Sequence, residues 1–232
     1  MAFKSNSCSE ATSKDSPATD MAKELTCTHS KTQVAYSVHS GYDTQLVMDM
    51  DEKWREEKIK IAKGILQKHP ECQASQEEFY KRIVECNMQD FEWNWMNKAM
   101  LCRGPEYHWF FLLANELVQA ACIIYHPKES RIGSDKIFYV DYLAAAFWNR
   151  RRPDYVRQFD GLGTILLAHS IKYATDVLQY RPGFSLHSLP QAESYYARLG
   201  MNDLGVDTAK ENLKFFEASA DVSIKIMEEN YA

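Results

Sequence analysis

A six-residue run, Gln-Phe-Asp-Gly-Leu-Gly at positions 158–163, lies where a strand-like segment gives way to a helix-like one. Residues 137–146 before it are almost continuously apolar, and apolar residues from Leu162 onward recur at helical spacing. Glycines at such a junction let backbone N–H groups turn toward an anion, and the first helical turn adds unpaired donors and a positive dipole end. The run therefore predicts a strand, a cradle for a pyrophosphate and a helix. Two glycines that form only a turn are the alternative.

The segments after this helix extend the pattern. A short strand-like run at 184–187 is followed by residues 188–201, Ser-Leu-Pro-Gln-Ala-Glu-Ser-Tyr-Tyr-Ala-Arg-Leu-Gly-Met. The succession of strand, glycine-rich turn, helix, strand and helix ending in Leu-Gly resembles the GNAT superfamily of N-acetyltransferases. The resemblance covers roughly residues 107–219.

Two motifs carry this resemblance. The acetyl-CoA motif of the superfamily, Q/R-x-x-G-x-G/A, is matched by Gln158, Gly161 and Gly163. The later helix motif, A-x-x-F-Y-x-x-L-G-F, is matched with Tyr for the first Phe and Met for the last, at Ala192, Tyr195, Tyr196, Leu199, Gly200 and Met201. The chain departs from the strand motif L-x-V-x-P, which here reads Leu143-Ala-Ala-Ala-Phe147, and has a longer connection at 148–157. Because of both departures, the motifs do not determine how far that loop extends or how it shapes the adjoining acceptor site.

The resemblance implies a fold and an activity. The expected fold is mixed α/β (α+β), with a mostly antiparallel central sheet and helices on both faces. The expected activity is an N-acetyltransferase that moves the acetyl group of acetyl-CoA, its cosubstrate, directly to an amine acceptor, which is a small molecule or a protein. No metal is expected. One rival is a catalytically silent GNAT-like domain that binds acyl-CoA or a partner protein. Another is an interaction surface formed by the residues before 107.

The resemblance also places the coenzyme along the end of one strand and on the turn that follows. The cofactor-binding residues it implies are Leu143, Ala144, Ala145, Arg157, Gln158, Phe159, Asp160, Gly161, Leu162, Gly163 and Thr164. The three arginines at 150–152 are further candidates for the coenzyme phosphates, since guanidinium groups match phosphate geometry. A solvated basic loop is the equal alternative for those three.

Tyr196 and Asp141 are the expected catalytic residues. By resemblance, Tyr196 protonates the departing thiolate, and a phenol with an ordinary pKa near 10 suits that task. Asp141 interrupts an apolar strand, and strand alternation places it on one face with Leu143 and Ala145. By resemblance it faces the acceptor amine, whereas an ion pair with a nearby arginine is the alternative. His187 is a further candidate for the base or for orienting the acceptor.

Composition and the spacing of apolar residues divide the rest of the chain into parts. Residues 1–31 are rich in Ser, Thr, Lys, Asp and Glu, which predicts a disordered or flexible arm. Residues 32–106 are expected to be mainly helical and to contribute to the acceptor side, and residues 107–219 to form the catalytic core. Within these parts the sequence predicts a first strand at 33–38, helices at 49–67 and 75–86, a hairpin of 107–114 and 117–125, a strand at 136–146, a capping box of Ser188 with Gln191, a closing strand pair at 202–206 and 212–218, and a C-terminal helix within 220–232.

The net charge and the cysteine pattern limit the kinds of partner and the compartment that this sequence predicts. A formal net charge of −5 argues against nucleic-acid binding, which needs many Lys and Arg residues to neutralise phosphates. No apolar run approaches the length of a membrane span, and no targeting segment is apparent. The six cysteines include no C-x-x-C pair, which indicates reduced thiols and a cytoplasmic protein. We expect a monomer or a homodimer without membrane or nucleic-acid partners.

Overall fold

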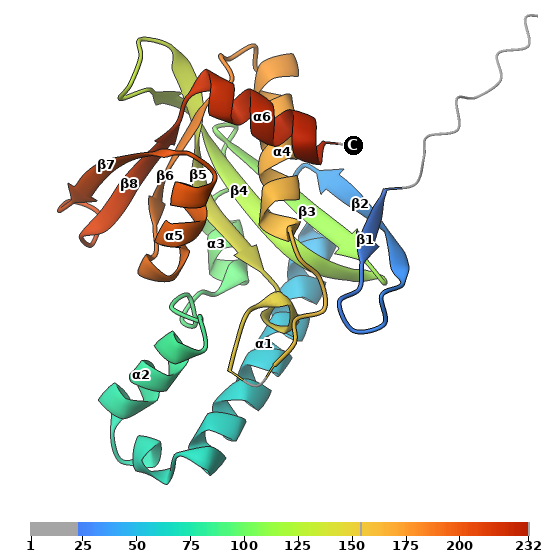
Figure 1. Cartoon of the computed structure of the whole chain (residues 1–232), viewed down its shortest axis with the longest axis vertical. Coiled ribbons are helices and arrows are strands. Elements are labelled where there is room, and N and C mark those ends of the chain that lie inside the picture. The colour runs from blue at the N-terminus through green and yellow to red at the C-terminus, as the bar shows by residue number, and fades with distance from the viewer. Residues whose placement is uncertain (1–22, 154, 232) are drawn as a thin grey trace, which may run out of the picture.

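The computed structural model describes residues 23–153 and 155–231. Its strands form one eight-stranded sheet in the order β1-β2-β3-β4-β5-β6-β8-β7 (Figure 1). Neighbouring strands are antiparallel except for the parallel pair β5 and β6. The strands are β1 (Glu24–Thr26), β2 (Gln33–Ser40), β3 (Tyr107–Ala114), β4 (Leu117–Glu129), β5 (Lys136–Ala145), β6 (Phe184–Ser188), β7 (Asn202–Asp207) and β8 (Leu213–Ala218).

Helices cover both faces of this sheet. They are α1 (Thr44–Lys68), α2 (Gln76–Glu85), α3 (Trp95–Leu101), α4 (Leu162–Asp176), α5 (Glu193–Arg198) and α6 (Ala220–Asn230), with 3-10 turns at Pro70–Gln73, Phe147–Asn149 and Pro190–Ala192. One core joins the sheet to α4 and α6, and a second joins its other face to α1 and α3 (Figure 1). The expected fold, a mixed α/β protein with a mostly antiparallel sheet between helices, is confirmed.

Local signals explain several element boundaries. Asp43 caps α1 by accepting a hydrogen bond from the Leu46 N–H at 3.0 Å, so the helix begins before the predicted residue 49. Ser75 caps α2 by accepting from the Glu78 N–H at 3.2 Å, as predicted. The β3–β4 hairpin turns through Asn115 and Glu116, whose φ angles of 51° and 61° both lie in the left-handed region. The two-residue loop is therefore confirmed, with a backbone that matches the twist of the strands.

The predicted capping box at Ser188 is wrong. Ser188 is the last residue of β6, and its Oγ donates to the Leu189 carbonyl at 2.9 Å. A 3-10 turn follows, and α5 begins only at Glu193 with no side-chain cap. Gln191 is free to bond elsewhere, because it lies in that turn and not at the third position of a helix.

Part of the predicted N-terminal arm belongs to the sheet. Residues 1–22 lie outside the described residues. Residues 24–26, inside the predicted arm, form β1, which pairs antiparallel with β2. The loop after β1 also reaches the glycine-rich run, since the Thr28 N–H donates to the Gln158 carbonyl at 2.9 Å. Tertiary pairing thus orders a polar segment that buries little apolar surface of its own.

A β-bulge reverses the alternation of β5 at Asp141. Ile123 pairs with Tyr142 and Ile124 with Val140, so Asp141 has no partner on β4. Val140 and Leu143 consequently pack in the same core, the one that holds α4, whereas Tyr142 packs in the other. The prediction that Asp141 shares a face with Leu143 and Ala145 is wrong, because an inserted residue shifts every later side chain to the opposite face.

The parallel strands β5 and β6 separate after a short contact. They pair only from Phe138 with Phe184 to Val140 with Leu186. Beyond that point β5 continues to Ala145 with β4 as its one partner. Among the residues that the structure describes, no strand pairs with the other edge of β5 from Asp141 to Ala145, and this gap positions the candidate site.

Candidate active site

A cleft of about 1020 Å³ opens in the gap between β5 and β6. Its walls come from the end of β5, from α5, from the β7–β8 turn and from the segment between α2 and α3. The cleft thus combines segments that lie more than one hundred residues apart in the chain. The expected residues that line it are Asp141, Leu143, Ala144, Ala145, Arg157, Gly161 and Tyr196.

The N-terminus of α4 faces one end of this cleft. Gly161 precedes the helix with φ = 76°, a left-handed conformation that glycine adopts without steric cost, and no side chain caps the helix. Within residues 23–153 and 155–231, no hydrogen bond reaches the N–H groups of Gly161, Leu162 and Gly163. A Cβ at residue 161 would meet nothing within 4 Å. The turn therefore presents free donors and open space, which suits an anionic ligand.

Six expected cofactor-binding residues do not line the cleft with their side chains. Phe159 and Leu162 are buried in the core beneath α4. Thr164 Oγ1 lies 2.9 Å from Tyr195 Oη, and a Cβ at residue 163 would lie 3.5 Å from the same oxygen. Gly163 and Thr164 thus hold α5 close against α4. The remaining residues of this set are Gln158 and Asp160.

Arg157 is the basic side chain of the expected set and lies at the same end of the cleft. Its guanidinium forms an ion pair with the carboxylate of Asp160, three residues along the turn. Asp160 is exposed, so this pair lies in water and contributes little to stability. An incoming phosphate can therefore replace the carboxylate without the cost of breaking a buried ion pair.

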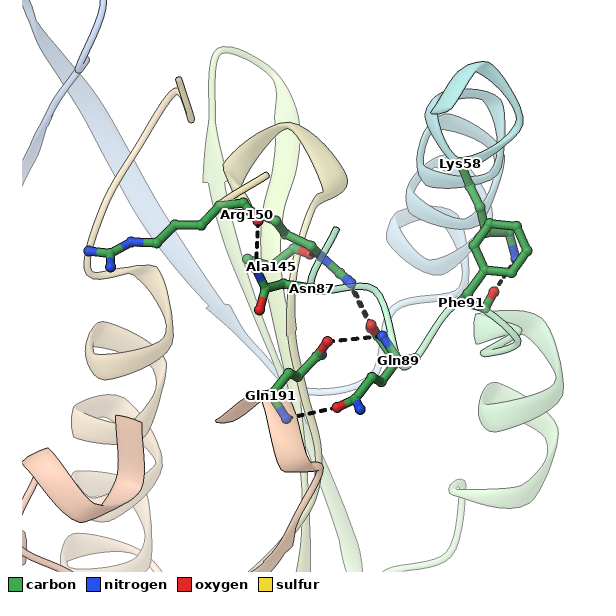
Figure 2. Close-up of polar contacts among 9 residues, drawn as sticks. Lys58, Asn87, Gln89, Phe91, Ala145, Arg150 and Gln191 are labelled. Atoms are coloured by element: carbon green, nitrogen blue, oxygen red, sulfur yellow. Dashed lines mark hydrogen bonds and ion pairs between the residues drawn. The ribbon is translucent and has the colours of Figure 1, made fainter. Parts of the chain in front are cut away.

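A polar bridge that the sequence did not predict spans the cleft (Figure 2). The Gln89 N–H donates to the Gln191 side chain at 2.9 Å, and the Gln191 N–H donates to the Gln89 side chain at 2.7 Å. Beside it, Arg150 forms a buried ion pair with Asp90 and donates from Nε to the Ala145 carbonyl at 2.8 Å. The bridge joins the α2–α3 segment to the end of β5 and to the turn before α5.

The guanidinium of Arg150 is therefore already bonded within this bridge. The three arginines at 150–152 have different surroundings. Arg151 is exposed at the cleft, and its carbonyl accepts a hydrogen bond from Asn87 at 3.0 Å (Figure 2). Arg152 stacks on Tyr155, with 3.8 Å from its guanidinium carbon to the ring centroid. Of the three, only Arg151 combines exposure with a place at the cleft.

The opposite end of the cleft contains Asp141 and a buried lysine. Lys98 Nζ lies 3.3 Å from the ring centroid of Tyr142 and 4.3 Å from that of Trp93. Burial lowers the pKa of Lys98 to about 8, opposed by the charge of Asp141. Burial also raises the pKa of Asp141, opposed by Lys210 and Lys98. Sequence reasoning missed Lys98 because no pattern marks a lysine whose aromatic neighbours come from other elements.

Tyr196 contributes to the wall of the cleft from α5. Its ring is buried and lies 5.9 Å from that of Phe216. Burial raises the pKa of the Tyr196 phenol, so the group keeps its proton. Tyr195 packs against α4 through Thr164, and burial raises its pKa to about 12. His187 lines the cleft from β6 and is hydrogen-bonded to Tyr139 and Asp207.

Comparison with solved structures finds similar chains that include N-acetyltransferases. The N-acetyltransferase PseH of Campylobacter jejuni is 13% identical over 79% of this chain and 97% of its own, with a TM-score of 0.41. A structure described as a GNAT-family acetyltransferase from Desulfovibrio desulfuricans is 13% identical over 80% and 99%, with a TM-score of 0.45. FeeM, an N-acyl amino acid synthase from uncultured soil microbes, is 11% identical over 83% and 94%, with a TM-score of 0.43. No family model and no curated protein matches the chain.

The described residues contain neither a metal-binding cluster nor a helix that could span a membrane. Residues 23–153 and 155–231 contain no group of three or more His, Cys, Asp or Glu side chains arranged to hold a metal ion. No helix in that part of the chain is long and apolar enough to cross a bilayer. Five cysteines, Cys27, Cys72, Cys86, Cys102 and Cys122, are free thiols.

Proposed function

We propose that this protein is an acetyl-CoA-dependent N-acetyltransferase that transfers the acetyl group directly to a bound amine. The observation that carries the proposal is a coincidence of three features at one cleft. They are the uncapped N-terminus of α4, the unpaired edge of β5 and a protonated phenol on α5. The helix N-terminus suits a diphosphate, and the unpaired strand edge suits an extended arm that carries amide groups. The phenol suits a leaving thiolate, which needs a proton.

The coenzyme would bind along these features in order. The N–H groups of residues 161–163 would hold the diphosphate, with Arg157 and Arg151 beside it. The pantetheine arm would lie against the edge formed by residues 143–145, where backbone groups lack a neighbouring strand on one side. A backbone N–H of that edge would also stabilise the carbonyl oxygen as it gains charge, because such donors are fixed before the reaction.

Transfer needs a proton donor for sulfur and an anchor for the amine. Tyr196 would donate its phenolic proton to the departing thiolate, because it lines the cleft and is in the protonated form that a donor requires. Burial raises the pKa of this phenol, so its proton is harder to release than that of an ordinary tyrosine. Asp141 would attract the acceptor as an ammonium ion from the opposite end of the cleft. The acceptor, a small molecule or a protein, remains to be identified. Free thiols support the cytoplasm as the compartment we propose.

Calorimetry and turnover together test this function. We expect purified protein to bind coenzyme A and acetyl-CoA and to release free thiol when an amine panel is added. Tyr196→Phe should retain coenzyme binding and lose turnover by about 100-fold, the range of general acid catalysis. Coenzyme binding without turnover on any amine would favour the silent GNAT-like domain. No binding of either coenzyme would overturn both.

A further inference from the structure

A chain of three hydrogen-bonded side chains leads from the acceptor end of the cleft to the surface. Tyr139 Oη on β5 lies 2.8 Å from His187 Nδ1 on β6, and His187 Nε2 lies 3.1 Å from Asp207 Oδ2 at the end of β7. Tyr139 and His187 both line the cleft. Asp141, the residue expected to attract the amine, lines the same cleft, and after burial its charge is the next cause that raises the pKa of the Tyr139 phenol.

The partners of the imidazole fix the direction of these hydrogen bonds. Arg131 donates to Asp207 Oδ2 at 3.0 Å, and the Ala209 N–H donates to Oδ1 at 3.1 Å. These hydrogen bonds, with that of His187, lower the pKa of Asp207 to about 2, so the carboxylate only accepts. His187 Nε2 therefore carries the proton in the neutral ring, and Nδ1 accepts from the Tyr139 hydroxyl.

Exposure increases from His187 to Asp207. The His187 side chain is 6% exposed and that of Asp207 is 20% exposed. The imidazole packs edge-on against the buried Phe215, with ring centroids 4.9 Å apart. The imidazole itself is therefore largely buried, and Asp207 is the more exposed end from which a proton can leave to water.

We propose that Tyr139 is a catalytic residue that takes a proton from the acceptor ammonium, and that His187 and Asp207 are positioning residues that act through it. The proposal rests on the proposed acetyltransferase function. The Tyr139 oxygen would accept the ammonium proton while its own proton passes to His187 Nδ1. The resulting imidazolium is stabilised by the Asp207 carboxylate, and its Nε2 proton leaves to water along that side.

The protons of the whole reaction then balance. The amine nitrogen attacks the thioester carbonyl, a C–N bond forms and the C–S bond breaks. Of the three ammonium protons, one stays on the amide nitrogen and one leaves through Tyr139. The third returns to Tyr196 after that phenol has protonated the sulfur. The products are the amide, the free thiol of the coenzyme and one proton released to water.

The charges around the imidazole suit this role. Burial lowers the pKa of His187, whereas the hydrogen bond and charge of Asp207 raise it, and Arg131 and Lys210 lower it. On the β5 side the neighbours are Tyr139 and Asp141, and burial raises the pKa of the Tyr139 phenol. In the resting state the phenol is therefore protonated and the imidazole is neutral, which is the state that can accept a proton.

A double-mutant cycle tests the chain in the full-length protein. Tyr139→Phe removes the hydroxyl, and His187→Asn keeps an acceptor near the Nδ1 position but cannot take up a proton. We expect each change to lower kcat/KM for the amine by about 100-fold and to leave acetyl-CoA binding by calorimetry unchanged. The double variant should lose little more than either single variant, since both interrupt one path. Tyr125→Phe, a hydroxyl removed from β4 at a position paired with Tyr139 but outside the cleft lining, is the matched control.

The pH profile adds a readout that a structural role would not move. Asp207→Asn removes the group that raises the His187 pKa, so the acidic limb of kcat/KM should shift to lower pH. The proposed proton path would be overturned if the losses of the two single variants multiplied in the double variant, or if Asp207→Asn left the acidic limb unchanged. Turnover by the unmodified protein would in either case still support the acetyltransferase function. Absence of turnover in the unmodified protein would instead refute the function on which the chain depends. Thermal melting of each variant separates a folding defect from a kinetic one.

Discussion

Gln89 and Gln191 exchange two hydrogen bonds across the cleft, the backbone N–H of each donating to the side chain of the other (Figure 2). The contact joins the α2–α3 segment to the turn before α5. Neither residue belongs to a motif, and 102 positions separate them. This reciprocal pair fixes the distance between these two walls of the cleft. Under the proposed function, the arm of the coenzyme would lie beside them.

The first prediction concerns this pair. Gln191→Ala should speed dissociation of acetyl-CoA several-fold in stopped-flow experiments, because a wall of the cleft loses its tether. Gln89→Ala should act alike, and the double variant should add little, with a coupling of about 1 kcal/mol in unfolding free energy. Gln76→Ala, on the exposed first turn of α2, is the control. Additive effects of the two changes would show that the pair does not act as one contact.

The second prediction concerns the buried ion pair beside it. Asp90 and Arg150 have side chains 5% and 9% exposed, so Asp90→Asn leaves a buried guanidinium without its counter-charge. We expect a loss of about 3 kcal/mol in urea unfolding, and partial recovery when Arg150→Met is added. Asp176→Asn breaks the exposed pair with Lys172 and should change the urea midpoint very little, because water screens that pair. Equal losses at the two sites would contradict the burial argument.

The third prediction contrasts two glycines. Gly161→Ala places a side chain at φ = 76° and should destabilise the protein by about 1 kcal/mol through backbone strain, since no atom lies within 4 Å of the new Cβ. It should also weaken coenzyme binding. Gly64→Ala lies inside α1 with the same open surroundings and should stabilise by about 0.5 kcal/mol. Urea denaturation measures both, and the same sign for the two changes would refute the conformational explanation.

The fourth prediction concerns the pH dependence of stability. Because burial lowers the pKa of Lys98 to about 8, the native state binds fewer protons than the unfolded state between about pH 8 and the ordinary lysine pKa near 10.4. Stability should therefore rise with pH across that window. Lys98→Met removes this contribution, so at pH 7 its stability relative to the unmodified protein should be higher than it is at more alkaline pH. This difference should vanish near pH 11, and a constant difference from pH 7 to 11 would contradict the buried charge.

Much of the fold was readable from local pattern. The turn at Asn115 and Glu116, the Ser75 cap and the apolar run of β5 each depend on residues close in sequence, and each is confirmed. The predicted cap at Ser188 failed because the chain there forms a 3-10 turn before α5. Local propensity could not anticipate that turn, since Gln191 is held by a residue from a distant segment.

The candidate site likewise has features that local sequence predicts and features that it does not. The sequence by itself determined the glycine-rich turn, the helix that follows it and the aspartate in an apolar strand, because backbone conformation and hydrophobic period are local properties. Only the tertiary structure decided which way Asp141 faces, that Arg150 is tied to Asp90, and that Tyr139, His187 and Asp207 form one chain. A bulge, a buried ion pair and a hydrogen-bond relay all depend on which strands become neighbours, and that choice follows from packing the whole sheet between its two layers of helices.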